Sequence, residues 1–477
     1  MLLVAVIVVW TLPLDGQVII TTERGLGFPA PQIRLKPAAP TPGQEAKIWV
    51  TDAEPWAHVL LTVDNAPAQL EESYQNPDQS WTWIWRFTAP EKEGYPIIFY
   101  RDCHRGCNIR GQVEIGVRLA EDNVGLVPTK LGVIFPSPTR DWHNRQAWGV
   151  DLTYATLADE APWGIDHLAT RVRHHQEKGV LMLVRVDYAP GQTLPPAGDD
   201  VALAEFLAYT ARLARDERLK DVHGYIIGSG YNAFTSNQRD IDRAVTPEWY
   251  ARVFNGYGQR VTQKDNVVQI IRRENPQVDI LVGPVRPWNS DQNGTQTYTL
   301  DAPWLNYFNT LVFYLEESRH VKTEAGLTRV GPDGFAIEAP GNPSAPELGQ
   351  TAPAKEPGLD LQRATWDGAQ TGFGIYRDWL AIINSYPATK NLPVYISSTN
   401  TFVRTDDITP AQNYPQGWLT AAQAEIQQTP QIKSLIWFMD DLGDDDQWAA
   451  FSLTQQSGRL ADAAEEFDRL LQGDAHE

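Results

Sequence analysis

Acidic side chains stand within or at the ends of several short apolar segments in the second part of the chain. They are Asp151, Asp187, Glu338, Asp440 and Asp441. If such carboxyl groups meet in one place, they can divide acid and base work between them, because different surroundings give them different pKa values. The alternative is that they accept hydrogen bonds and cap loops without doing chemistry. The choice depends on the elements that position them.

Eight apolar segments alternate with helical patterns in this region. The segments span 130–136, 147–154, 179–188, 222–230, 278–285, 333–340, 392–400 and 434–441. Helical periodicity is found at 164–178, 201–219, 246–274, 303–320, 367–385 and 416–429, and a last amphipathic helix closes the chain. This alternation predicts a (β/α)8 TIM barrel over residues 128–477, although the crossover 137–146 is too short for a good helix. In that fold the acids near strand ends would gather at one face.

Residues 31–125 have a different pattern of apolar and polar residues. Short runs of alternating apolar and polar residues recur about every ten residues, separated by Pro, Gly, Asn and Asp. This pattern predicts a small all-β domain, an Ig-like β-sandwich, in front of the barrel. Trp81, Trp83 and Trp85 share one face of a strand. We expect these rings to pack in the sandwich core, and the alternative is a platform for sugars.

Five motifs in the predicted barrel follow one another in a set order. They are TPEWYARVFN, ENPQVDILVGPV, DGFAI, LPVYISSTNTF and SLIWFMDD. In this order they resemble the barrel of the large clan of retaining glycoside hydrolases, over about residues 130–470. The resemblance implies a carbohydrate substrate and two catalytic glutamates, at the ends of strands four and seven. One glutamate protonates the leaving oxygen and the other attacks the anomeric carbon.

Neither glutamate is present at the matching positions. In IIGSGYN (226–232) Gly230 takes the place of the acid/base, and in VYISSTN (394–400) Ser398 takes the place of the nucleophile. A local slip in the alignment restores neither, because the nearest acids are at least eight residues away, and eight residues span roughly 26 Å in a strand. We therefore predict a barrel that has lost its relatives' hydrolytic chemistry.

Displaced acids are the alternative source of catalysis. An active glycosidase would draw an unusual pair from Asp187, Glu338 and Asp440, or use one acid with help from the substrate. We expect ligand contacts from the side chains beside the replaced positions and from the rim. These are Asp151, Tyr231, Asn232, Trp288, Asn400 and Trp437. Trp437 and Phe438 are adjacent on the last strand, so only one of them can point inward, and the resemblance implies an aromatic floor under the sugar there. Asp151 is expected to accept from sugar hydroxyls.

Composition narrows the range of ligands. The formal net charge of −20 over 477 residues disfavours nucleic acid and suits neutral ligands such as sugars. The mean hydropathy of −0.37 excludes a polytopic membrane protein. The sequence holds no glycine-rich phosphate loop, no HExxH and no GxSxG motif, and the run DDLGDDDQW lacks EF-hand spacing. We expect no cofactor and no metal.

Two features point to export. Residues 1–10 are wholly apolar, so the segment 1–30 is interpreted as an export signal or membrane anchor with a linker. The alternative is a buried N-terminal strand. Cys103 and Cys107 are the two cysteines, and their spacing favours a tight disulfide over a metal half-site with His104. We expect an extracellular or cell-surface protein.

Three functions fit these observations. The favoured one is an inactive barrel that binds a glycan or takes part in a cell-surface assembly with protein partners. The second is an active glycosidase that uses rim carboxylates. The third is a purely structural surface protein.

Overall fold

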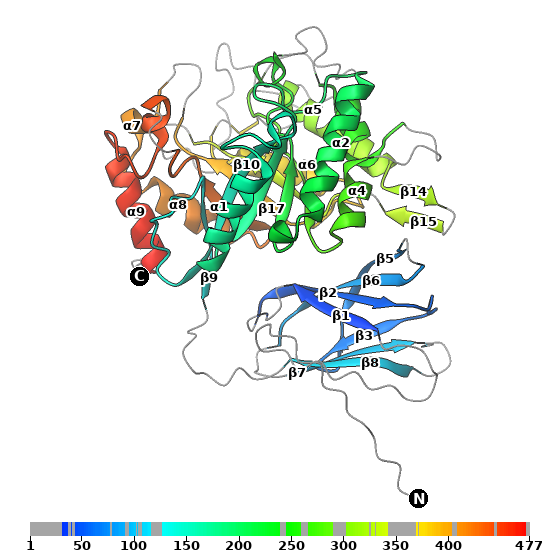
Figure 1. The fold of residues 1–477 in the computed structure, drawn as a ribbon. Coiled ribbons are helices and arrows are strands. Elements are labelled where there is room, and N and C mark those ends of the chain that lie inside the picture. The colour runs from blue at the N-terminus through cyan, green and yellow to red at the C-terminus, as the bar shows by residue number, and fades with distance from the viewer. Residues whose placement is uncertain are drawn as a thin grey trace, which may run out of the picture. The chain divides into compact units, whose positions relative to one another are not determined.

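The computed structural model describes most of the chain, apart from both termini and several loops (Figure 1). The described residues are 31–36, 40, 43–76, 79–90, 95–101, 103, 107–115, 126–238, 245–258, 266–289, 302–323, 326–329, 331–341, 369–370, 372–402, 408–442 and 446–473. The chain divides into two compact units between residues 123 and 124, with 324–328 grouped with the first unit. The expected export segment 1–30 lies outside the described residues. Within them, no helix is both long enough and apolar enough to cross a bilayer.

Eight parallel strands close into a barrel in the second unit (Figure 1). In order around the barrel they are β9 (Val127–Ile134), β10 (Arg145–Tyr154), β11 (Leu181–Asp187), β12 (Gly224–Ile227), β13 (Asp279–Val282), β16 (Gly334–Glu338), β17 (Val394–Thr399) and β18 (Ile432–Trp437). Strand β18 then pairs with β9, which completes the ring. Each strand overlaps one of the predicted apolar segments, so the predicted TIM barrel is confirmed.

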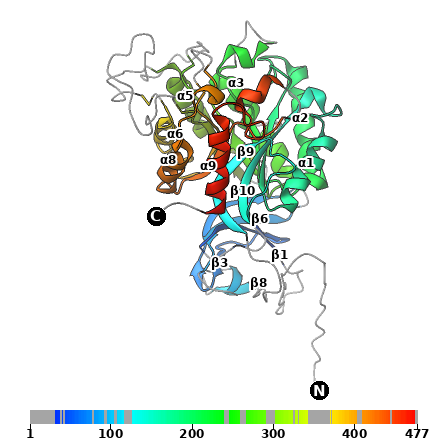
Figure 2. The ribbon, with the colours of Figure 1, turned by 90° about the vertical axis from the view of Figure 1, so that its left-hand side faces the viewer.

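Helices cover the outside of the barrel, and Figure 2 shows α9 face on, beside α8. They are α1 (Ile165–Glu177), α2 (Asp200–Arg215), α3 (Pro247–Asn255), α4 (Val267–Glu274), α5 (Pro303–Glu317), α6 (Ile375–Ile383), α7 (Pro410–Asn413), α8 (Trp418–Gln427) and α9 (Leu460–Gln472). A two-stranded hairpin, β14 (His320–Thr323) with β15 (Gly326–Arg329), follows α5.

The single helix expected over 246–274 is in fact two helices. Gly256 ends α3 because it adopts the left-handed conformation with φ 82°, which L-residues with side chains rarely adopt. Asn266 begins α4, and its side chain accepts a hydrogen bond from the backbone N–H of Gln269 at 3.0 Å. The crossover after β9 contains turns and no helix, as its length predicts.

Alternate side chains on each barrel strand point inward and outward. The inner cluster fills the barrel with Trp148, Val150, Leu183, Ile226, Leu281, Ala336, Tyr395 and Ile436. Their neighbours in sequence, such as Val184, Ile227 and Leu435, join the larger cluster beneath the helices. This two-residue period decides which residues near a strand's C-terminal end can reach the barrel mouth.

The first unit is a sandwich of two antiparallel sheets. One sheet has the order β1 (Gln32–Lys36), β2 (Glu45–Asp52), β6 (Trp81–Thr88) and β5 (Gln69–Gln75). The other has the order β4 (Ala66–Pro67), β3 (Leu60–Val63), β7 (Tyr95–Arg101) and β8 (Asn108–Ile115). Trp83 and Trp85 are buried in the core cluster and Trp81 packs against it, which confirms the predicted core role.

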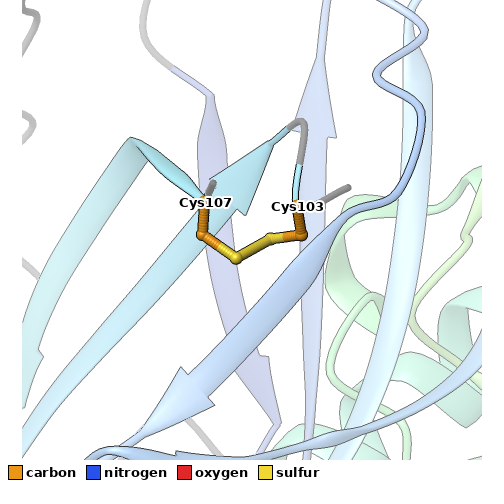
Figure 3. Close-up of a disulfide and its surroundings, with 2 residues drawn as sticks. All are labelled: Cys103 and Cys107. Atoms are coloured by element: carbon orange, nitrogen blue, oxygen red, sulfur yellow. A yellow bond between two sulfur atoms is a disulfide. The ribbon is translucent and has the colours of Figure 1, made fainter. Parts of the chain in front are cut away.

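The two cysteines are joined. Figure 3 shows the disulfide between Cys103, which follows β7, and Cys107, which precedes β8. This confirms the predicted pairing, and it removes both sulfur atoms from the alternative metal half-site. His104, the third member of that alternative, lies outside the described residues.

Asp378 on α6 gives the fold a pH dependence. The residue is 7% exposed and accepts a hydrogen bond from the Gln370 N–H at 2.8 Å. Burial raises the pKa of Asp378 from 3.8 to about 6, against the opposing effects of that hydrogen bond and of Arg377. The folded state therefore holds more protons than the unfolded state between these pKa values, so the free energy of unfolding falls as pH rises from about 4 to 6.

We expect Asp378→Asn to remove this fall. Between pH 4 and pH 7, the free energy of unfolding of the variant should rise relative to that of the wild type by up to about 3 kcal/mol, since one pKa unit corresponds to about 1.4 kcal/mol. Urea denaturation at a series of pH values measures the difference. Asp462→Asn on α9, where the aspartate is exposed, controls for the loss of one negative charge. A constant difference between wild type and Asp378→Asn across this pH range would contradict the prediction.

Candidate functional site

The C-terminal mouth of the barrel has one polar side, which begins on β11. Arg185 and Asp187 lie two residues apart on the inner face of β11 and form a two-point ion pair, with Nε of Arg185 3.0 Å from Oδ1 of Asp187. Thr193 donates a further hydrogen bond to Oδ1 at 3.2 Å. The side chain of Asp187 is 4% exposed, whereas that of Arg185 is 34% exposed. The carboxylate is therefore held inside, and the guanidinium presents a surface to the mouth.

The pKa shifts of Arg185 and Asp187 show which other groups lie near this ion pair. Burial opposes the charge of Arg185, yet Asp187, Tyr154 and Glu338 raise the pKa of its guanidinium. Burial also raises the pKa of Asp187, while Arg185 and Thr193 oppose that change. Because such interactions fall off with distance, these groups share one end of the barrel. The sequence prediction brought Asp187 and Glu338 to this end but missed Arg185.

Glu338 ends β16 and lies beside the two replaced positions. The hydroxyl of Ser229 donates to Oε1 of Glu338 across a long 3.5 Å contact. Ser398 of β17 is the register partner of Glu338. The neighbours of Ser398 are turned to the backbone of β16: Ser397 donates to the Ile337 carbonyl and Thr399 to the Ala339 carbonyl. The expected nucleophile position therefore presents a hydroxyl next to Glu338.

Gly230 lies three residues beyond β12, and its surroundings leave little room for a side chain. Its φ of 61° is left-handed, and its N–H donates to the Pro284 carbonyl at 2.8 Å. A Cβ at this position would lie 3.2 Å from both Nη2 of Arg286 and Oγ of Ser236. Arg286 also donates to Oγ1 of Thr235 at 2.9 Å. A guanidinium thus borders the place where the resemblance expects an acid.

The other side of the mouth is aromatic. Tyr154 lies 5.3 Å from Trp163, and Trp163 lies 6.0 Å from Phe135, measured between ring centroids. The carbonyl of Trp163 accepts a hydrogen bond from Thr153, which fixes the loop after β10. A second cluster follows β17 and β18. Its rings are Phe402, Phe438, Trp448 and Phe451, at centroid distances of 5.4 to 5.9 Å.

All seven rings are partly exposed. They lie at or after the C-terminal ends of β17, β18, β9 and β10, which are consecutive in the barrel. The polar groups lie at or after the C-terminal ends of β11, β12, β13 and β16. We call these groups of residues the aromatic half and the polar half of the mouth. The aromatic half was not predicted from the sequence, where its signal was the recurrence of aromatic residues just after strands.

Three expected ligand contacts face away from the mouth. Asp151 points outward from β10 and is bound by Arg171 of α1, with Nε to Oδ2 at 2.8 Å. Tyr231 is buried against Tyr250 and donates to the Gly283 carbonyl. Trp437 is wholly buried near Trp418 of α8, because Ile436 takes the inward direction on β18. None of the three can touch a ligand in the mouth in this structure.

Four other expected residues fix loops. Asn232 bonds both the N–H and the carbonyl of Arg286, at 2.8 and 3.0 Å. Asn400 is buried and accepts from the Phe402 N–H. Asp440 is wholly buried and paired with Arg140, so it is not a displaced catalytic acid at the mouth. Trp288 is half-buried at the rim and donates to the Gln370 carbonyl, so its role in ligand contact stays a prediction.

Among the described residues, no group of three or more His, Cys, Asp or Glu side chains could hold a metal ion. The mouth therefore offers ion pairs, hydroxyls and aromatic rings to a ligand.

No protein-family model matches the chain, and no curated protein matches it. Solved structures with a similar architecture include a family 39 glycoside hydrolase from Bacteroides cellulosilyticus WH2, at 12% identity and a TM-score of 0.45 over 92% of this chain and 83% of that one. They also include a glucosidase from Croceicoccus marinus, at 14% identity and a TM-score of 0.43 over 73% and 68%. Thermotoga maritima Cel5A, in complex with mannotriose, has 10% identity and a TM-score of 0.35 over 72% and 97%. Likeness at this level assigns no activity to this chain.

The crowding at Gly230 can be measured. We expect Gly230→Ala to lower the free energy of unfolding by about 2 kcal/mol, because the added Cβ meets Arg286 and the left-handed backbone is strained. Gly258→Ala is the matched control: its φ is 71°, but a Cβ there meets nothing within 4 Å. The control should lose about 1 kcal/mol, from backbone strain alone. If urea denaturation gives equal losses of unfolding free energy for the two variants, the side chain of Arg286 moves aside at no cost and the prediction is wrong.

Proposed function

We propose that the barrel is a non-hydrolytic glycan-binding domain whose ligand lies across the mouth. The observation that carries this proposal is the division of the mouth into an aromatic half and a polar half. Sugars have apolar faces that stack on aromatic rings and hydroxyl edges that need hydrogen-bonding partners. Binding sites that combine apolar walls with a few convergent polar groups match both needs.

The ion pair of β11 argues against hydrolysis. Retaining hydrolysis needs two carboxyl groups about 5–5.5 Å apart, one of which must exchange protons with the substrate. Asp187 is 3% exposed, and its oxygen atoms already accept from Arg185 and Thr193. A carboxylate fixed in this way is a poor proton donor and a poor nucleophile. The positions that the family resemblance couples, Gly230 and Ser398, carry no carboxyl group.

The proposal places the protein outside the cytoplasm, at the cell surface or beyond it. Two features support this location: the apolar N-terminal segment and the disulfide between Cys103 and Cys107. The sandwich unit would display the barrel or join it to surface proteins. The glycan partner would be neutral, in keeping with the acidic composition of the chain.

Calorimetry and a reducing-sugar assay on one panel of oligosaccharides test the proposal. The panel should include cellotriose, mannotriose and maltotriose, so that linkage and sugar are both varied. We expect binding heat without release of reducing ends. Turnover at an ordinary enzymatic rate that disappears in Glu338→Gln would support the active glycosidase that uses displaced acids. Absence of binding to every member would favour the purely structural role.

Trp163→Ala and Phe438→Ala test the aromatic half. Each variant removes one partly exposed ring, and we expect each to weaken glycan binding roughly tenfold, or by about 1.4 kcal/mol. Phe313→Ala on α5 removes a half-buried ring on an outer helix and should leave the dissociation constant unchanged. Titration calorimetry with the best ligand of the panel measures all three. An equal loss of affinity in Phe313→Ala would point to a general loss of folding and contradict a role for the mouth.

A further inference from the structure

A polar pocket of about 340 Å³ lies where three parts of the barrel unit meet. They are the loop after β9, the segment 453–456 that follows β18 along the chain, and α9. The lining shares no residue with the polar half or the aromatic half of the mouth. Ser137 and Leu453 each lie two positions after a ring of the aromatic half, Phe135 and Phe451, so the pocket borders the loops of the mouth but is lined by other side chains.

An ion-paired arginine forms the buried part of this pocket. The side chain of Arg140 is 8% exposed, and its Nε lies 2.7 Å from Oδ2 of Asp440 while Nη1 lies 3.0 Å from Oδ1 of Asp468. Burial opposes the charge, yet the two carboxylates raise the pKa of Arg140, so the guanidinium stays charged and compensated. The carboxylate of Asp440 is wholly buried, and that of Asp468 is 47% exposed.

The carboxylates around the pocket outnumber its guanidinium, and this excess of negative charge excludes anions as ligands. A third carboxylate, Asp141, lines the rim and is 77% exposed, and His143 lies 3.6 Å from it. Three carboxylates around one guanidinium repel phosphate, sulfate and carboxylate groups. The side chains of Asp141 and Asp468 remain accessible as acceptors for hydroxyl groups.

Uncharged groups supply the rest of the lining. Thr139, Thr454 and Gln456 are exposed at the edge, and the hydroxyl of Thr454 reaches the Asp440 carbonyl at 3.1 Å. Leu453 and Ala464 add a small buried apolar patch. The lining residues that the structure describes include no Phe, Tyr or Trp, so large flat aromatic ligands gain little here. This mixture of hydroxyl, amide and carboxylate groups suits a ligand that is itself an array of hydroxyls.

We propose that this pocket is a second binding site, for a neutral sugar of one or two rings. Its volume is at the low end of the range of ligand pockets, roughly 300–1,000 Å³, which matches a ligand of that size. The hydroxyls of the sugar donate to Asp141 and Asp468 and accept from the side-chain amide of Gln456. The site does not depend on binding at the mouth. Its affinity is millimolar, because an open polar pocket releases little apolar surface from water.

Hydrogen–deuterium exchange measured by mass spectrometry tests the proposal on the full chain. Glucose, galactose, cellobiose and maltose are the probes, each at high millimolar concentration, with putrescine as a cation and inorganic phosphate as an anion. We expect at least one sugar to slow exchange in segments 137–143 and 453–468, and inorganic phosphate not to do so. No effect from any of the four sugars, or an effect from putrescine or phosphate in their place, would overturn the proposal.

Two variants locate the effect. Thr454→Trp places an indole in the pocket, and Gln456→Ala removes an amide without adding bulk. Each should weaken the protection by the sugar at least about tenfold while thermal stability stays near that of the wild type. Val201→Trp on α2, where Val201 is 71% exposed, is the control for an added indole and should leave the protection unchanged. Protection that persists in both pocket variants would show that the sugar binds elsewhere.

Discussion

The closure of a parallel sheet into a ring is the constraint on which the rest of this molecule depends. Closure pairs every barrel strand on both edges, so each strand has one face toward the axis and one toward the helices. Among the residues of the strands themselves, only inward ones near the C-terminal ends can meet a ligand in the mouth. Arg185, Asp187 and Glu338 satisfy this condition, and Asp151 and Trp437 do not.

Arginine partners decide what the acids of this barrel do. Asp151, Asp187 and Asp440 are each bound by an arginine, namely Arg171, Arg185 and Arg140. A carboxylate in a buried ion pair organises its surroundings, and it costs several kcal/mol to leave either member alone. Two of the three candidates for displaced catalysis, Asp187 and Asp440, are thus held in ion pairs. Glu338 differs because it is partly exposed and lies beside two serines, Ser229 and Ser398.

The sequence predicted the barrel well because each apolar segment carries its own local signal. All eight strands and the sandwich core of Trp83 and Trp85 could be identified in this way. The site was harder to predict, because the choice between Trp437 and Phe438 as the inward residue depends on the strand's exact register. Long-range pairs leave no local trace: Arg140 and Asp440 are 300 positions apart. Arg185 could have been predicted as a site residue, because it lies two positions from Asp187 on a strand and residues at that spacing share one face.

The pairing of β9 with β18 has a consequence for how the protein is made. Strand β9 leaves the ribosome early, but its partner on one side is the last strand of the barrel. Until β18 is synthesised, β9 presents an unpaired edge of the kind that recruits other chains. Helix α9, which follows β18, adds a further contact, because buried Glu466 accepts hydrogen bonds from Tyr414 and from the Thr420 N–H in α8. The nascent barrel is therefore an open sheet until β18 has been synthesised, and only this last barrel strand closes the exposed edge of β9.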